Sequence, residues 1–277
     1  MKCYELQNNK IIIKDKNKFN CEHTLLCGQI FRFKTTDSGY LCFSKNKRAI
    51  INNKDNGYEI ITKDIPYFIN FFDLDRDYDI INESLECHEV LRDAINFGRG
   101  IRIIKNDTFE MIISFIISAS NNIPRIKKII ELLCLGAGKN MGEYYAFPTL
   151  EELKLKPLEF FESLHAGYRA KYLFQTVQYL TEDLLQNMKS MSTENAKKEL
   201  LKLMGVGDKV ADCILLFGLS KMNVFPVDTW IEKVYKTQFH GTLKSRKEMR
   251  IYFVSLFSEL SGYAQQYLFY YKRTGKV

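Results

Sequence analysis

The chain has 277 residues, 46% of them hydrophobic and 26% charged, so it can bury a large core without metals or disulfides. Its formal net charge of +7 favours a polyanionic partner, because phosphate contacts release counterions, although many basic proteins bind no nucleic acid. No apolar run approaches the roughly 18–20 residues that span a bilayer, and the seven cysteines form no CxxC pair or zinc pattern, so membrane and zinc functions are excluded.

The first part of the chain, from residue 1 to about 85, predicts a small antiparallel sheet. It is rich in β-branched and aromatic residues, and the turns at residues 37–39 and 52–57 contain Asp, Asn and Gly. The expected strands are residues 10–14, 29–34, 40–43, 49–52 and 58–62.

From about Glu86 onward the hydrophobic period becomes helical. Asp107 and Glu110 have the spacing of a capping box, and Asn122 before Pro124 predicts the start of a second helix that ends near residue 136. Further helices are expected over residues 157–164, 169–185, 193–203, 208–219, 229–237 and 247–271, the last interrupted near Gly262. We therefore divide the chain into a sheet domain, residues 1–95, and a helical domain, residues 96–277.

The segment around Gly205-Val206-Gly207 is the most informative one, because a helix begins directly after it at Asp208. Two glycines allow a tight turn and a close approach of the backbone to a ligand. The unpaired amides at the start of the second helix suit a phosphate. This arrangement is typical of a helix-hairpin-helix that grips the DNA backbone, but an ordinary helix–helix turn with a glycine cap has the same pattern.

Lys209 lies in the first turn of that second helix. A cation there opposes the helix dipole, so we expect the dipole to favour the neutral, nucleophilic amine. Cys213 lies four residues on and shares its helix face. The commoner roles of these residues are a solvent-facing lysine and a small core residue.

Asp228 follows Phe225-Pro226-Val227 and precedes the helical pattern that begins at Thr229. Asp is a favoured N-cap, so a purely structural role explains it well. A carboxylate at a helix start can also face a cleft, and the two roles are compatible.

These residues resemble the 8-oxoguanine glycosylase family within the helix-hairpin-helix glycosylase superfamily. The matching motifs, in family order, are residues 28–33 (GQIFRF), 115–125 (FIISASNNIPR), 167–170 (GYRA), 205–213 (GVGDKVADC), 226–228 (PVD) and 262–269 (GYAQQYLF). Each motif is weak alone, but together they are highly specific and run from about residue 19 to 272.

The resemblance implies the catalytic and base-recognition residues. Lys209 would be the nucleophile that forms a Schiff base, and Asp228 its acidic partner. The carbonyl of Gly28 would read the hydrogen on N7 of the oxidised base, and Gln265 would bind its Watson–Crick edge. Phe269 and Cys213 would contact the two faces of the base.

The resemblance also implies the DNA contacts. Asn122 corresponds to the residue that fills the gap left by the flipped base, with Asn121 beside it, and Tyr168 corresponds to the wedge aromatic. Arg125 and Arg169 correspond to the arginines that bind the opposite cytosine. Gly205 and Gly207 belong to the DNA-gripping hairpin.

Two positions depart from the family pattern. Ser120 stands where many relatives have an Asn that contacts the orphan cytosine, so we predict weaker discrimination for cytosine. Trp230 stands where the better-known eukaryotic members have a phosphate-contacting His, which puts one phosphate contact in doubt, although its indole N–H can still donate.

Two rival functions stay open at this point. Adenine-mismatch and oxidised-pyrimidine glycosylases often carry a four-cysteine cluster near the C-terminus, whereas the last cysteine here is Cys213. Alkylated-base glycosylases generally lack a lysine at the position of Lys209. A non-enzymatic DNA-binding module would need neither Lys209 nor Asp228.

The resemblance implies an α+β fold in which a twisted antiparallel sheet, like that of the TATA-binding protein, packs on the mostly α-helical helix-hairpin-helix glycosylase domain. We expect a bifunctional glycosylase and abasic-site lyase of base excision repair, with no organic cofactor. A monovalent cation at the hairpin carbonyls is left open. The expected partner is duplex DNA containing 8-oxoguanine, and the expected state is a monomer. With no signal sequence and an odd number of cysteines, we expect a prokaryotic cytoplasm and an association with the nucleoid.

Overall fold

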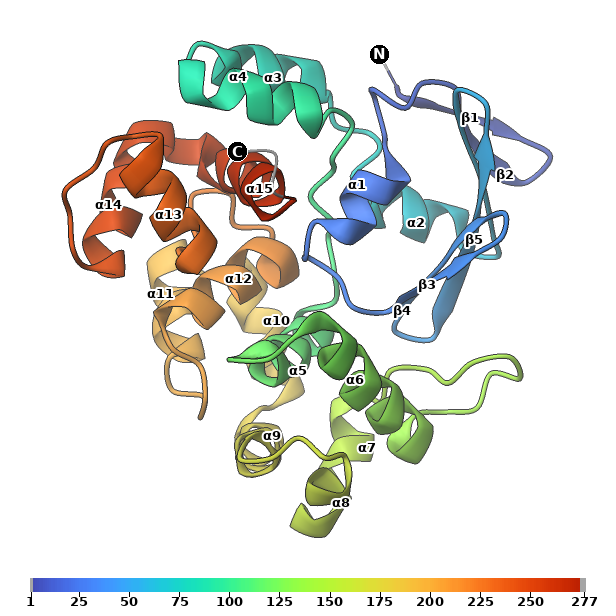
Figure 1. The fold of residues 1–277 in the computed structure, drawn as a ribbon. Coiled ribbons are helices and arrows are strands. Elements are labelled where there is room, and N and C mark those ends of the chain that lie inside the picture. The colour runs from blue at the N-terminus through green and yellow to red at the C-terminus, as the bar shows by residue number, and fades with distance from the viewer. Residues whose placement is uncertain (1, 275–277) are drawn as a thin grey trace.

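The computed structural model describes residues 2–274 and shows a six-stranded antiparallel sheet beside a larger helical part (Figure 1). This confirms the predicted order of a sheet followed by a mostly helical domain; the likeness of the sheet to the TATA-binding protein stays a prediction. None of the helices over the described residues is both long and apolar enough to cross a membrane.

The sheet has the strand order β1-β2-β6-β5-β4-β3 with every neighbouring pair antiparallel. Alternate side chains face one side, so Ile51 and its partner Ile60 are fully buried. The strands are β1 (Tyr4–Gln7), β2 (Lys10–Ile13), β3 (Phe33–Thr36), β4 (Gly39–Ser44), β5 (Lys47–Lys54) and β6 (Gly57–Thr62).

The sequence prediction was wrong for the segment before β3. Residues 29–32 form no strand, and the buried Gln29 side chain instead joins this segment to the backbone of two others. Its Nε2 donates to the carbonyls of Thr24 and Arg102, and its Oε1 accepts from the amide of Ile104. Strand β1 was missed because its residues are mostly exposed and show no apolar alternation.

Four helices also lie in the first hundred residues; the first three fall in the part predicted as a sheet, up to about residue 85, and the fourth lies where the helical pattern was expected. They are α1 (Cys21–Leu26), α2 (Ile65–Phe71), α3 (Tyr78–Glu86) and α4 (Glu89–Phe97). Helix α2 contributes buried phenylalanines to the core of the sheet. Helices α3 and α4 join the core of the helical part instead, with Leu85 and Leu91 fully buried there. The predicted domain boundary at residue 95 stays a prediction.

The helical part follows the predicted pattern closely from the hairpin onward, and α12 and α13 have the predicted bounds. Its helices are α5 (Thr108–Ser118), α6 (Ile123–Ala137), α7 (Leu150–Lys154), α8 (Leu158–Ser163), α9 (Arg169–Tyr179), α10 (Glu182–Ser190), α11 (Thr193–Leu200), α12 (Asp208–Leu219), α13 (Thr229–Thr237), α14 (Arg246–Phe257), the 3-10 helix η1 (Ser258–Leu260) and α15 (Ser261–Arg273). The break predicted near Gly262 is confirmed by η1, which begins at Ser258 with a φ of 47°.

Three details of the helical prediction were wrong, the first being that the short helix α7 was not expected. The helix expected over residues 169–185 is divided, because Thr181 caps a new helix through a hydrogen bond from the amide of Leu184. Asp107 does cap α5, but Glu110 does not complete a capping box. Its buried carboxylate accepts from the amide of Lys45 and lies 3.5 Å from Arg32, which ties α5 to the sheet.

Candidate functional site: a closed base pocket beside a helix hairpin

The hairpin between α11 and α12 leaves an uncapped helix end exposed. Gly205 has a φ of +83°, and a Cβ there would lie 2.4 Å from the Tyr172 ring, so glycine is required. Gly207 is the N-cap of α12 and offers no side-chain hydrogen bond. A Cβ on Gly207 would meet no atom of the described residues within 4 Å, so the first amides of α12 are open to an anion.

Buried ion pairs hold α12 in place behind this end. Asp212 is 1% exposed and receives hydrogen bonds from Lys197 at 2.9 Å and from Arg250 at 2.6 Å. Burial raises the pKa of the Asp212 carboxyl, and the two cations act in the opposite direction. Lys197 also pairs with Asp208 in the first turn of α12 at 2.9 Å. The start of the helix that carries Lys209 is therefore fixed to α11 and α14.

Four segments that are far apart in the sequence meet in one small pocket: the end of α1, helix α5, helix α12 with the loop before α13, and helix α15. The pocket has a volume of about 50 Å³. Its lining residues are Cys27, Gly28, Phe115, Lys209, Cys213, Phe217, Pro226, Asp228, Gln265, Gln266 and Phe269. The structure thus brings together every residue for which the sequence predicted a catalytic or base-recognition role.

Lys209 is half-buried among the groups that the sequence placed beside it. Its Nζ lies 5.7 Å from the centre of the Phe115 ring. The pKa of Lys209 is raised above its usual value. Cys213 and Asp228 both raise it, Cys213 the more, whereas desolvation lowers it. The net direction is therefore opposite to the neutral amine that the helix dipole alone led us to expect. Cys213 and Asp228 together outweigh desolvation and favour the ammonium form of Lys209.

Asp228 serves as the N-cap of α13. One carboxylate oxygen, Oδ1, accepts hydrogen bonds from the amides of Trp230 and Ile231, both at 2.9 Å. The other oxygen has no hydrogen-bond partner among residues 2–274, and the residue lines the pocket. The capping bonds therefore fix the orientation of a carboxylate that is available to the pocket.

Cys213 lies one turn beyond Lys209 and is 4% exposed. Burial raises the pKa of its thiol, and Lys209 acts in the opposite direction. The side chain is therefore a neutral thiol at neutral pH, and its sulfur is a small, polarisable atom against which a base can pack.

Helix α15 contributes the polar wall of the pocket. Gln265 is 5% exposed, and its Oε1 is buried without a hydrogen-bond partner among the described residues. Because such a group costs free energy when it is unpaired, it is a candidate for binding a ligand. The neighbouring Gln266 donates from Nε2 to the carbonyl of Cys27 at 2.7 Å, so α15 is tied to the end of α1 beside Gly28.

The sequence reasoning missed several lining residues. Phe217 and Cys27 were not singled out, and Gln266, Pro226 and Phe115 were quoted only as parts of motifs. Nothing in the sequence distinguishes Phe115 or Phe217 from core residues, since both are buried in helices and stack on one another. Gln266 had a usable signal, because it is a polar residue inside an apolar helix next to Gln265.

The loop between α5 and α6 holds the predicted gap-filling residues. The exposed Asn122 caps α6 by accepting from the amide of Arg125 at 3.0 Å. Asn121 donates to the carbonyl of Ile117 and accepts from the amide of Asn122. Ser120 is exposed with a φ of 49°, in the left-handed region. The loop is thus preformed by its own amide side chains.

The segment before α9 packs under this loop. Arg169 is 3% exposed, and its guanidinium donates to the carbonyls of Ala119, Ser120 and Ala166. In this state it shapes the loop, and its predicted contact with an opposite cytosine stays a prediction. Tyr168 is 54% exposed, and Arg125 is exposed beside it with a bond to the carbonyl of His165. These two side chains are available to DNA.

Trp230 lies in the first turn of α13, where the Lys233 amine is 4.9 Å from the centre of its ring. Its predicted phosphate contact stays a prediction, as does a cation at the hairpin. Over residues 2–274, no three His, Cys, Asp or Glu side chains gather into an arrangement that could hold a metal.

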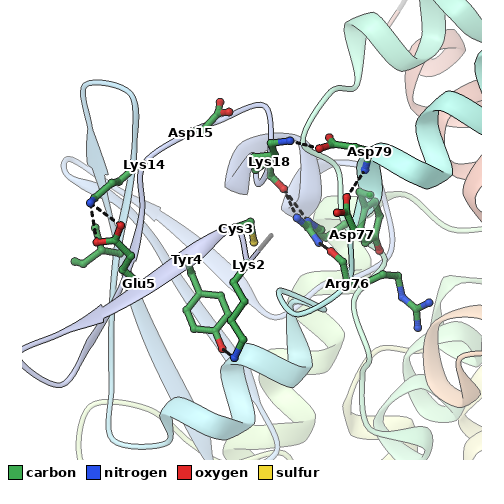
Figure 2. A pocket seen from close by; sticks show the side chains of 13 residues that line it. Lys2, Cys3, Tyr4, Glu5, Lys14, Asp15, Lys18, Arg76, Asp77 and Asp79 are labelled. Carbon is green, nitrogen blue, oxygen red and sulfur yellow. Dashed lines mark hydrogen bonds and ion pairs between the residues drawn. The ribbon is translucent and has the colours of Figure 1, made fainter.

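Other pockets lie away from Lys209, among them a small one of about 110 Å³ between the starts of α5 and α7 and helix α10, and two larger ones. One, of about 290 Å³, is formed by β1, β2 and the start of α3 (Figure 2). Its charges are already paired, since Lys14 bonds Glu5 and Lys18 bonds Asp79. The other, of about 610 Å³, lies between β3, β4 and α6. Neither contains any of the predicted site residues except Arg32 and Phe31 of the first motif, which line the second one.

Comparisons with known proteins agree with this geometry. A family model described as "8-oxoguanine DNA glycosylase, N-terminal domain" matches residues 11–112. A probable N-glycosylase/DNA lyase from Methanothermobacter thermautotrophicus is 32% identical over 73% of this chain and 72% of its own length. The N-glycosylase/DNA lyase OGG1 of Arabidopsis thaliana is 33% identical over 62% of this chain, and the match spans only 52% of that relative.

One solved structure resembles this chain over its whole length. The 8-oxoguanine glycosylase/lyase of Clostridium acetobutylicum, in complex with double-stranded DNA containing cytosine opposite to 8-oxoG, superposes with a TM-score of 0.91 at 37% identity. The superposition covers 100% of both chains. Together with the archaeal relative, this places the chain in the 8-oxoguanine DNA glycosylase/lyase family of the helix-hairpin-helix glycosylase superfamily.

Proposed function

We propose that this protein removes 8-oxoguanine from duplex DNA and then cuts the strand at the abasic site, in base excision repair. The observation that supports this most is the pocket itself, where Lys209 and Asp228 lie with Gly28, Cys213, Gln265 and Phe269. The pocket adjoins an uncapped helix end that suits a phosphate. Its solved relative from Clostridium was crystallised with this lesion opposite cytosine.

The damaged base has to leave the helix to reach this pocket. We propose that Gln265 binds the Watson–Crick edge, because its amide offers both a donor and an unpaired acceptor. The Gly28 carbonyl would accept from the N7 hydrogen that distinguishes 8-oxoguanine from guanine. Phe269 would stack on one face of the base, and Cys213 would lie against the other.

The proposed chemistry starts from the Lys209 ammonium. Its proton passes by way of Asp228 to the base. This transfer leaves Lys209 as a neutral nucleophile and protonates the base, which needs a proton to depart. The Lys209 nitrogen then bonds to C1′ as the bond from C1′ to N9 breaks, and the bonding electrons leave with the base. Asp228 stabilises the positive charge that develops on the sugar, which is usually a large catalytic contribution.

The strand is cut in a second stage. The sugar ring opens as O4′ leaves C1′ and takes a proton, which gives an imine between C1′ and Lys209. Loss of a proton from C2′ expels the 3′-phosphate by β-elimination. Water then hydrolyses the imine and restores the amine.

The gap in the duplex would be filled from the loop between α5 and α6. The exposed Asn122 and Tyr168 are the proposed wedges, and Arg125 the proposed contact to the opposite base. Since Ser120 has a shorter side chain than the Asn of many relatives, we propose a relaxed preference for opposite cytosine. The protein is proposed to act as a monomer in a prokaryotic cytoplasm, with no organic cofactor.

The test is release of the free base from a duplex with one 8-oxoguanine opposite cytosine, measured by mass spectrometry. Wild-type protein should release 8-oxoguanine and leave guanine in place, and Lys209→Gln should release at least 100-fold less. A matched control is Lys236→Gln, which removes an exposed cation that pairs with Glu232. DNA binding without base release by the wild type would favour a binding module.

A further inference from the structure

The base pocket is closed in the free protein. Its volume is about 50 Å³, well below the roughly 300–1,000 Å³ of typical ligand pockets, so it is too narrow for a purine in this conformation. The Phe269 ring causes this, because it lies directly against Gly28. A Cβ on Gly28 would be only 3.2 Å from Cε1 of that ring. The side chain proposed to stack on the base therefore lies against the glycine proposed to read it.

Arg273 lies one helical turn beyond Phe269 at the end of α15. Its side chain makes three contacts around Gly28. Its guanidinium lies 5.2 Å from the centre of the Phe269 ring. It donates a hydrogen bond to the carbonyl of Leu26, the last residue of α1. Its Nη1 would lie 3.0 Å from a Cβ on Gly28. One side chain thus links the ring, the end of α1 and the glycine.

We propose that Arg273 is a latch that holds Phe269 across the pocket, so that a flipped purine enters only when the latch opens. This inference rests on the proposed function. A guanidinium suits the task because its plane stacks on an aromatic ring while its edge donates to a carbonyl. Arg273 acts through Phe269 and is a positioning residue.

The latch makes base entry a separate equilibrium that follows DNA binding. At saturating protein, the observed excision rate is the chemical rate multiplied by the fraction of complexes with an open pocket. A lesion base that bonds Gly28 and Gln265 can compensate for breaking the latch. Cleavage of DNA that already contains an abasic site needs no base in the pocket, so it should not depend on Arg273.

The experiment measures single-turnover rates at saturating protein on two duplexes, one with 8-oxoguanine and one with a preformed abasic site, both opposite cytosine. The variants are Arg273→Met, which keeps the length but removes the donors and the charge, and Arg273→Gln as a second substitution. Arg273→Lys keeps a cation and a donor. Lys14→Met, which removes an exposed cation paired with Glu5, controls for lost charge.

The latch predicts that Arg273→Met and Arg273→Gln raise the ratio of base excision to abasic-site cleavage by about three- to tenfold. Arg273→Lys and Lys14→Met should leave that ratio within twofold of wild type. An unchanged or lower ratio in both Met and Gln variants overturns the latch while the proposed function stands. A wild-type protein that cuts abasic DNA but releases no 8-oxoguanine overturns both.

Discussion

Asp228 offers a way to separate stability from catalysis at a single position. Its Oδ1 caps α13 through the amides of Trp230 and Ile231, whereas its other oxygen is available to the pocket. Asn keeps a capping oxygen but carries no charge, and Ala loses both. Asp228→Asn therefore removes the catalytic charge alone, and Asp228→Ala removes both the charge and the helix cap.

The expected magnitudes follow from these contacts. Loss of the charge at the helix N-terminus should lower the free energy of unfolding by about 0.3–1 kcal/mol in Asp228→Asn. Asp228→Ala loses the cap as well, so its free energy of unfolding should be lower than that of the wild type by about 1.5–2 kcal/mol. Both variants lose the charge that faces the developing positive sugar, so both should lose about 100- to 1,000-fold in excision rate.

Urea unfolding gives the stability of each variant, and single-turnover release of 8-oxoguanine gives its activity. We predict that Asp228→Ala is less stable than Asp228→Asn, and that both variants lose excision activity to a similar, large extent. Near wild-type excision by Asp228→Asn would refute the catalytic role. Equal destabilisation by both substitutions would refute the capping role.

Three further changes follow from the site. Gly28→Ala should cost about 1–2 kcal/mol in folding, because its φ is +87°, and should abolish base release while DNA binding, measured by fluorescence anisotropy, persists. Ser120→Asn should increase the ratio of excision opposite cytosine to excision opposite adenine; an unchanged ratio would remove Ser120 from the account. The proposed excision starts from the Lys209 ammonium, whose pKa is raised, so the rate of base release should stay level above pH 7 and fall only when the pH passes the Lys209 pKa; a rate that rises steadily above pH 7 would contradict the ammonium assignment.

The helices around the hairpin could be predicted because their ends carry local signals. Helix α12 begins after Gly207 and α13 begins after Asp228, and both bounds agree with the sequence prediction. Helices α1 and α2 were missed because they are only six and seven residues long and depend on packing against the sheet. Periodicity cannot identify segments of that length.

The site could be predicted only with the help of the family resemblance. Gln265 and Phe269 show no chemical signal in the sequence, and only folding brings α15 to Gly28. The direction of the Lys209 pKa was wrong because we considered only the helix dipole, whereas Cys213 and then Asp228 raise this pKa by more than desolvation lowers it. The burial of Arg169 under the loop was equally invisible, since its partners are backbone carbonyls.

Covalent trapping tests the central claim, that Lys209 is the nucleophile, most directly. Protein is mixed with a duplex that contains one 8-oxoguanine opposite cytosine, the imine is reduced with borohydride, and the linked peptide is identified by mass spectrometry. The account predicts an adduct on Lys209 in the wild type, none in Lys209→Gln, and an undiminished adduct in Lys236→Gln. An adduct on another residue, or an undiminished adduct in Lys209→Gln, would contradict it.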